Sequence, residues 1–202
     1  YTRVAKVAKT KEKNAVAELA VLDKLKPVLE EGQSARTIEF TEEEQKIVKS
    51  LFLLTSKPVL YVANVDEDTV ADPDSNEYVQ TVRNFAASEH SEVIVVCAEA
   101  EEEIAELDDE DKAEFLEAMG IEESGLDQLI RTAYDLLGLA TYFTAGEQEV
   151  RAWTFRKGTK APQAAGIIHT DFERGFIRAE TVSFDDLDKY GSMHAAKEAG
   201  RV

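Results

Sequence analysis

The sequence predicts an α/β plus α+β protein: a helical hairpin, then a region of parallel β/α units, then a small α+β module. Three observations support this prediction. Apolar residues recur at helical spacing in residues 1–55, and two short apolar runs alternate with helix-like stretches in residues 56–140. Residues 141–202 contain strand-like and helix-like stretches in another order, which is typical of a separate module.

The first predicted helix covers residues 4–31. Leucines recur there at helical spacing, at positions 19, 22, 25 and 29, and Lys and Glu occupy the other faces. Pro27 lies inside this pattern, so we expect a kink or the end of the helix at that point. Residues 32–34, Gly-Gln-Ser, are predicted to form a turn.

A second helix is predicted over residues 42–54. Thr41 and Glu44 fit a capping box, in which the hydroxyl accepts from the third backbone N–H and the Glu reaches back. Two helices with a short connection form a hairpin, similar to a coiled coil. Such a hairpin is too narrow to bury a large core alone, so we expect it to be an arm on another domain.

Residues 56–140 predict parallel β/α units. The apolar runs at residues 59–63 and 93–97 are predicted to be buried strands, and the polar stretch at residues 69–75 a loop. The predicted helices lie at residues 78–88, 101–107, 111–119 and 126–137, the last of them capped by Ser124 and ended by Gly138. This order is typical of a parallel sheet. Two strands are too few for a doubly wound sheet, so the rest of that sheet is expected outside this sequence.

The C-terminal residues predict a small module of the β-grasp kind. Strands are expected at residues 139–144 and 150–155, with Gly146 in the turn between them. A short helix at residues 162–169 and a strand at residues 176–182 complete the expected order of strand, strand, helix and strand.

The composition is that of a folded protein with an acidic surface. The 202 residues contain 44% hydrophobic and 32% charged side chains, and the formal net charge is −18. This excludes a disordered chain and argues against a protein that coats nucleic acid along its whole length. The single cysteine, Cys97, allows no internal disulfide and favours a reducing, cytoplasmic compartment. No run of 18 apolar residues occurs, so no membrane span is expected.

The excess negative charge lies in the middle of the chain. Residues 1–50 hold 10 basic and 9 acidic side chains, residues 51–140 hold 4 and 23, and residues 141–202 hold 9 of each. The densest run, residues 99–117, has 11 acids against one Lys. Its main interpretation is a solvated helical face, and a binding role is the alternative. The chain begins Tyr-Thr-Arg-Val, which is neither an initiator Met nor a signal peptide, so we expect it to start within a longer protein.

The best candidate site is the stretch Asn64-Val65-Asp66-Glu67. It directly follows a predicted buried strand, and open α/β folds bind ligands at the carboxyl ends of their strands. It resembles the base-reading loop of GTPases, Asn-Lys-x-Asp, in which the acid accepts two hydrogen bonds from guanine. Here Glu67 replaces the Asp and Val65 replaces the Lys, and both changes disfavour guanine. An ordinary strand-to-loop Asn is the alternative interpretation.

A second loop strengthens this candidate. Cys97-Ala98-Glu99 follows the second predicted strand and takes the place of the Ser-Ala-x loop that supports the base from its other side. Cys97 is also a conceivable nucleophile, but inert packing is the favoured interpretation.

Other motifs are weak or absent. The three histidines, at positions 90, 169 and 194, lack metal-ligand spacing, so zinc is not expected. The Asp-x-x-Gly string at residues 188–191 matches a GTPase switch, but it lies in the wrong module and is interpreted as chance. No Gly-Lys-Ser or Gly-Lys-Thr occurs, so this sequence has no phosphate-binding P-loop. Nucleotide hydrolysis of this kind needs that loop, so we expect a base-binding half and no catalytic residue here.

Several stretches resemble the YchF-type Obg-like ATPases, which are P-loop NTPases of the Obg and TRAFAC class. They read LTSKPVLYVANV at 54–65, AEAE at 98–101, IAEL at 104–107, LATYFTAG at 139–146, RAWT at 151–154 and GIIHTDFERGFI at 166–177. The resemblance implies a helical arm at residues 1–55, the C-terminal part of a G domain at 56–140 and a TGS domain at 141–202. It also implies that the TGS domain stops before the family's last two strands.

The resemblance further implies an enzyme that hydrolyses ATP in preference to GTP, because the family's base loop reads Asn-x-x-Glu. Asn64 and the Val65 backbone are then the expected adenine contacts, Glu67 is the specificity position, and Cys97 and Ala98 form the supporting loop. Mg²⁺ is expected through a P-loop that this chain lacks.

Family resemblance also implies ribosome or RNA binding through the arm and the TGS domain, without DNA specificity. Four basic residues near one another in the sequence could form one contact patch: Arg151, Arg156, Lys157 and Lys160. The rival class is a non-catalytic module that binds RNA, the ribosome or another protein. A P-loop upstream of Tyr1 in the natural protein would favour the enzyme.

Overall fold

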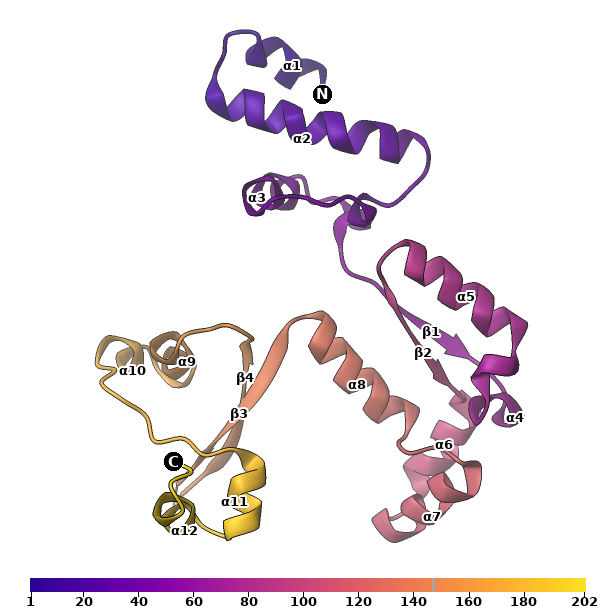
Figure 1. The fold of residues 1–202 in the computed structure, drawn as a ribbon, viewed down its shortest axis with the longest axis vertical. Coiled ribbons are helices and arrows are strands. Elements are labelled where there is room, and N and C mark those ends of the chain that lie inside the picture. Colours follow the sequence, from indigo (N-terminus) through magenta and orange to yellow (C-terminus); the bar gives the residue numbers. More distant parts are fainter. Residues whose placement is uncertain (147) are drawn as a thin grey trace. The chain divides into compact units, whose positions relative to one another are not determined.

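A computed structural model describes residues 1–146 and 148–202, which divide into two compact units, Tyr1–Leu137 and Gly138–Val202 (Figure 1). The first unit contains helices and a parallel strand pair, and the second contains an antiparallel strand pair and short helices. The predicted mixture of α/β and α+β structure is therefore present.

The first unit begins with two helices where the sequence predicts one. Helix α1 covers Thr2–Ala8 and helix α2 covers Lys13–Glu30, and α1 folds back along α2 (Figure 1). The break lies at Lys11, which adopts a positive φ of 61° that a continuing helix does not allow. The prediction of a single helix over residues 4–31 was wrong, because the spacing of apolar residues does not reveal such a local reversal of the chain. Helix α2 continues through Pro27 for three further residues.

Helix α3 covers Glu42–Ser50 and begins with the predicted capping box, in which Thr41 Oγ1 accepts from Glu44 N and Glu44 Oε2 accepts from Thr41 N. The helix ends four residues earlier than predicted, and Phe52 nearby has a positive φ of 52°. The single-turn helices η1 (Ala35–Thr37) and η2 (Leu54–Ser56) flank α3 in the sequence. A small core joins these elements, formed by Val21, Leu25, Ala35 and Val48.

Two strands form the parallel sheet of the first unit. Strand β1 (Leu60–Asn64) pairs in parallel with β2 (Glu92–Val96), so that Tyr61 lies opposite Val93 and Asn64 opposite Val96. The crossover between them contains α5 (Glu77–Ser88), as a parallel pair requires. The polar stretch predicted as a loop, residues 69–75, contains the last two residues of α4 (Glu67–Val70), which Asp66 caps, and all of η3 (Pro73–Ser75).

Three helices follow β2: α6 (Ala98–Glu106), α7 (Asp109–Met119) and α8 (Gly125–Leu136). Ser124 caps α8 as predicted, its Oγ accepting from Asp127 N at 3.1 Å. Glu101 of α6 adds a second cap, since its carboxylate accepts from Gly125 N at 2.6 Å and from Leu126 N at 3.1 Å. The acidic run is therefore more than a solvated face, because one of its carboxylates holds the start of α8.

The second unit contains strands β3 (Leu139–Ala145) and β4 (Val150–Arg156), which pair antiparallel as predicted. Its helices are α9 (Ala161–Ile168), α10 (Thr170–Arg174), α11 (Phe184–Tyr190) and α12 (Met193–Glu198). Helix α9 is tied to β3 by the Tyr142 hydroxyl, which donates to Ala164 O at 2.8 Å.

The strand predicted at residues 176–182 was wrong. No strand in the described part of the chain includes these residues, and Ile177 is 91% exposed. Alternating side chains favour a strand only where another strand offers backbone hydrogen bonds, and the antiparallel sheet described here pairs only β3 with β4.

Candidate functional site

Hydrogen bonds fix the path of the Asn64–Glu67 stretch at the carboxyl end of β1. Asn64 is the last residue of the strand, and the Val65 N–H donates to Val96 O of the neighbouring strand at 2.8 Å. Asp66 then caps α4, since its Oδ1 accepts from Thr69 N at 3.0 Å. Backbone and side-chain hydrogen bonds therefore hold this base loop, defined as residues 64–67, on both sides.

The Asn64 side chain connects the base loop to the loop after β2. Its Oδ1 accepts from the Ala98 backbone N–H at 3.0 Å. Ala98 is the first residue of α6, whose N-cap residue Cys97 makes no side-chain capping bond. Asn64 therefore satisfies one of the unpaired N–H groups at the start of α6. The two loops that the sequence singles out are in direct contact.

These bonds determine which groups remain for a ligand. Asn64 is exposed, and its Oδ1 is engaged with Ala98, so its amide NH₂ is the group that it offers as a donor. The Val65 N–H is engaged with Val96, so the Val65 backbone offers its carbonyl oxygen as an acceptor. Adenine presents the N7 acceptor and the N6 amino donor, whereas guanine presents acceptors at both N7 and O6. One donor beside one acceptor suits the adenine edge.

Glu67 is the first residue of α4, and its side chain is exposed. Within residues 1–146 and 148–202, no side chain is bonded to its carboxylate. The Glu67 carboxylate is therefore available to contact a ligand at the base loop. No bond among the described residues explains why a Glu occupies this position.

Cys97 takes a different position from the other predicted site residues. Its side chain is buried, with 3% exposed, and lines a cavity of about 250 Å³ together with Val96, Ala100 and residues of α8. It does not line the hollow beside Asn64. Burial favours the inert packing interpretation, and only the backbone of Cys97 can take part in a loop that supports a base.

Sequence reasoning missed the residues on the other side of the base loop. A hollow of about 500 Å³ lies between Asn64 and Val65 on one side and the start of α5 on the other. There Asn76 caps α5, accepting from Tyr78 N at 2.9 Å, and the Tyr78 side chain is 75% exposed. The available signal was the Asn-Glu-Tyr string, because Asn before a helix predicts a cap and places the aromatic residue in the first turn.

The four basic residues of the second unit do not all lie together. Arg151 lies opposite Thr144 and Arg156 opposite Leu139, so the two stand at opposite ends of the β3–β4 pair. They are five positions apart on one strand, an odd number, so their side chains also point to opposite faces. Arg151 stacks over the Trp153 ring, 4.2 Å from its centroid, and pairs with Glu149 at 3.9 Å.

Arg156, Lys157 and Lys160 follow one another where β4 ends and α9 begins. Lys157 N donates to Gly138 O at 2.7 Å, and Lys160 is the N-cap residue of α9. Arg151 and Arg156, two members of the expected patch, therefore lie at opposite ends of the strand pair.

Neither a metal cluster nor a membrane-spanning helix occurs among the described residues. No three His, Cys, Asp or Glu side chains in residues 1–146 and 148–202 could hold a metal ion together. Over the same residues, no helix combines the length and the apolar character needed to cross a membrane.

Comparisons with known proteins place the chain in one family. Residues 139–202 match the family YchF-GTPase_C, described as a protein of unknown function, DUF933. The chain is 67% identical over 201 residues to the "Ribosome-binding ATPase YchF" of Bacillus subtilis, covering 100% of this chain and 55% of that protein. It is 52% identical over 200 residues to the protein of the same name from Escherichia coli O157:H7, covering 99% and 54%.

A solved structure agrees with these sequence matches. The "Structure of the Schizosaccharomyces pombe YchF GTPase" superposes with a TM-score of 0.80 at 37% identity, covering 94% of this chain and 50% of that one. The chain thus spans about half the length of the curated relatives that it matches. From the matched residues, the identities and the shared fold together, the chain belongs to the YchF family.

Proposed function

We propose that the chain is part of a ribosome-associated, Obg-like ATPase and supplies the half of its nucleotide site that recognises the base. The relatives of similar sequence are named ribosome-binding ATPases, which supports the class of enzyme. We propose the division of the chain into arm, G-domain part and TGS domain on the same resemblance. A ribosome-bound role places the protein in the cytoplasm.

The observation that carries this proposal is the hydrogen bond from Ala98 N to Asn64 Oδ1. It joins the loops at the carboxyl ends of two adjacent parallel strands, where α/β proteins bind nucleotides. It also turns the Asn64 amide so that its NH₂ group is left for a ligand. The bond also satisfies an N–H group at the start of α6, so Asn64 has a structural role beside the one proposed here.

A preference for ATP over GTP follows from the groups at the base loop. The names of the relatives differ on this point, since one is called an ATPase and another a GTPase. The Val65 carbonyl accepts from the adenine amino group, whereas it would face the guanine O6 oxygen, another acceptor. Val65 also replaces the Lys of a guanine loop, and Glu67 replaces its Asp by an acid one methylene longer.

The phosphates and Mg²⁺ are proposed to be bound by residues outside these 202. A P-loop supplies backbone N–H groups and a Lys to the phosphates and a hydroxyl to Mg²⁺, and the sequence contains no Gly-Lys-Ser or Gly-Lys-Thr. The chain alone should therefore bind nucleotide weakly and hydrolyse none.

The substitution Asn64→Asp in the full-length protein tests the proposal. Asp keeps an oxygen that accepts from Ala98 N, so the loop connection survives, but it cannot donate to N7 of the base. We expect the affinity for ATP to fall about tenfold or more, as measured by calorimetry, because a site hydrogen bond is left unmade. Asn84→Asp, at an exposed position of α5, is the matched control and should leave the affinity unchanged. Equal ATP affinities in all three proteins would contradict the proposal.

A further inference from the structure

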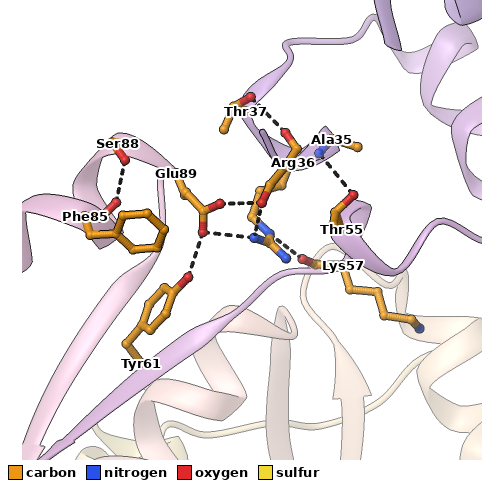
Figure 2. A network of polar contacts seen from close by, with 10 residues as sticks. Ala35, Arg36, Thr37, Thr55, Lys57, Tyr61, Phe85, Ser88 and Glu89 are labelled. Atoms are coloured by element: carbon orange, nitrogen blue, oxygen red, sulfur yellow. Dashed lines mark hydrogen bonds and ion pairs between the residues drawn. The ribbon is translucent and has the colours of Figure 1, made fainter. Parts of the chain in front are cut away.

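A buried carboxylate, Glu89, lies at the end of α5 and is bonded from several directions (Figure 2). The Tyr61 hydroxyl donates to its Oε2 at 2.7 Å, and Arg36 Nη1 donates to the same oxygen at 3.0 Å. The Ser34 hydroxyl donates to its Oε1. Arg36 Nε also donates to Lys57 O at 2.9 Å, so the guanidinium is held at both ends.

These residues belong to distant parts of the chain. Ser34 and Arg36 lie at η1, between the helices of the arm, whereas Tyr61 is in β1 and Glu89 follows α5. The carboxylate therefore connects the arm to the α/β part of the first unit. A bond within the arm lies beside it, since Ala35 N donates to Thr55 Oγ1 at 3.2 Å (Figure 2).

The Arg36–Glu89 pair differs in its burial from the ion pair between Lys24 and Glu44. The side chains of Arg36 and Glu89 are 14% and 9% exposed, whereas those of Lys24 and Glu44 are 45% and 20% exposed. Removing one member of a buried pair leaves an uncompensated charge, whereas a surface pair contributes little. The hydrogen bond from Ser34, then that from Tyr61 and the charge of Arg36, hold the pKa of Glu89 below its usual range against the effect of burial.

Tyr61 connects this network to the base loop. It lies on β1 three residues before Asn64, a distance of about 10 Å along a strand. Its ring also packs edge-on against Phe85 of α5, with centroids 5.9 Å apart. The group that fixes the arm is therefore bonded to the strand that ends in the base loop.

We propose that Glu89 is a positioning residue that couples the orientation of the arm to occupancy of the base loop; this inference rests on the proposed nucleotide function. A purine held at Asn64 and Val65 orders the end of β1, and an ordered β1 presents Tyr61 to Glu89. The network then opens less often, and the arm is held more firmly. Coupling is reciprocal, so opening the network must weaken nucleotide binding by the same factor.

Trypsin reports the state of this network directly. Cleavage after Arg36 requires its side chain to leave Glu89 and enter the protease, so the cleavage rate measures how often the network opens. The exposed Lys9 and Lys11, between α1 and α2, serve as internal reference sites in the same protein. In the full-length protein, we expect saturating ATP to slow cleavage after Arg36 about fivefold and to leave the reference sites unchanged.

The test substitution is Glu89→Gln, which keeps the shape of the side chain and removes its charge. We expect cleavage after Arg36 to rise about tenfold or more, the effect of ATP on that cleavage to disappear, and the affinity for ATP to fall about fivefold. Tyr61→Phe leaves the ion pair intact and serves if Glu89→Gln does not fold; it should give smaller changes of the same sign. Glu44→Gln is the matched control, because Gln also serves in a capping box and only a surface pair is lost.

The outcomes separate this inference from the proposed function. If the unchanged protein binds ATP, but ATP does not alter cleavage after Arg36, the coupling is overturned while the nucleotide function stands. The same holds if Glu89→Gln raises cleavage equally with and without ATP and leaves ATP affinity unchanged, since the network would then be structural only. If the unchanged protein does not bind ATP, the proposed function is overturned and the inference with it.

Discussion

Asn64 Oδ1 accepts a hydrogen bond of 3.0 Å from the backbone N–H of Ala98, which joins the ends of β1 and β2 through a single side chain. The two residues are far apart in the sequence, and the parallel register of the strands brings their loops together. The NH₂ group of the same amide remains as the donor for a ligand, so the oxygen connects the two loops and the nitrogen is available for recognition.

Guanine recognition should be restored by Val65→Lys together with Glu67→Asp in the full-length protein. The shorter carboxylate and the added Lys recreate the Asn-Lys-x-Asp loop that reads guanine. We expect the ratio of ATP to GTP affinity to shift toward GTP about tenfold or more, because a buried hydrogen-bonding group left unpaired typically costs about 1–3 kcal/mol. Calorimetric titration with both nucleotides measures the ratio. An unchanged ratio would remove the base-reading role from this loop.

Glu101→Gln should destabilise the protein although it removes one charge from a crowded acidic run. Its carboxylate accepts from two backbone N–H groups at the start of α8, and Gln provides only one, neutral, acceptor oxygen. We expect a loss of about 1 kcal/mol in the free energy of unfolding, measured with urea. Glu102→Gln, at an exposed position of the same helix, is the control and should change stability little or raise it slightly. Equal effects of the two substitutions would show that Glu101 is an ordinary solvated side chain that does not stabilise the start of α8.

Gly125→Ala tests the close contact of α8 with β2. A Cβ atom at residue 125 would lie 2.7 Å from Val96 Cγ1, closer than two carbon atoms can approach without a shift, and would make a tight contact of 3.0 Å with Glu101 Oε1. Although Ala favours helices over Gly, we expect a net destabilisation of about 1–3 kcal/mol from the overlap. Urea unfolding measures it. A gain in stability would show that α8 does not lie this close to the strand.

The network at Glu89 should make stability depend on pH in the acidic range. Its folded pKa is lowered by the hydrogen bonds from Ser34 and Tyr61 and by Arg36, so the ionised form is the one that folding favours. Its contribution is complete above the ordinary Glu pKa of about 4.3 and is lost as the pH falls through the lower, folded value. The difference in unfolding free energy between the unchanged protein and Glu89→Gln should therefore shrink below about pH 4. A difference that stays constant between pH 7 and pH 3 would contradict this assignment.

Ribosome binding should depend on Arg156, Lys157 and Lys160 more than on Arg151. The three lie at one end of the β3–β4 pair, whereas Arg151 is engaged with Trp153 and Glu149 at the other. Replacing all three with Ala should weaken binding and flatten the slope of log affinity against log salt by roughly one unit for each lost phosphate contact. Arg151→Ala should change neither quantity. The test is to measure ribosome binding of each variant at several salt concentrations. An unchanged slope in the triple variant would show that these three residues do not contact the ribosome.

Local sequence signals predicted much of this structure. Thr41 with Glu44 and Ser124 with its following residues mark helix starts correctly, because capping depends on residues three apart. The base loop and the loop at Ala98 were found because both follow apolar strands. Their direct contact was not predicted, since it depends on the register of β1 against β2.

The remaining features depend on contacts between distant segments. Glu89 lies 55 residues from Ser34 and 28 from Tyr61, so no local pattern marks it as a buried anchor. The prediction of a strand at residues 176–182 failed for a related reason. Alternating apolar and polar side chains do not show whether another strand is available for pairing. The reversal at Lys11 escaped prediction because the flanking residues keep helical spacing on both sides.

The most direct test of the account is to locate the bound base itself. The full-length protein would be labelled by light with 2-azidoadenosine triphosphate, whose reactive group is on the base, and the modified peptides identified by mass spectrometry. We predict that the label lies within residues 60–70 or 96–101, that excess ATP abolishes it, and that GTP competes about tenfold less well. Asn64→Asp should reduce the same label. Specific, ATP-protected labelling confined to other parts of the protein would contradict the claim that this chain recognises the base.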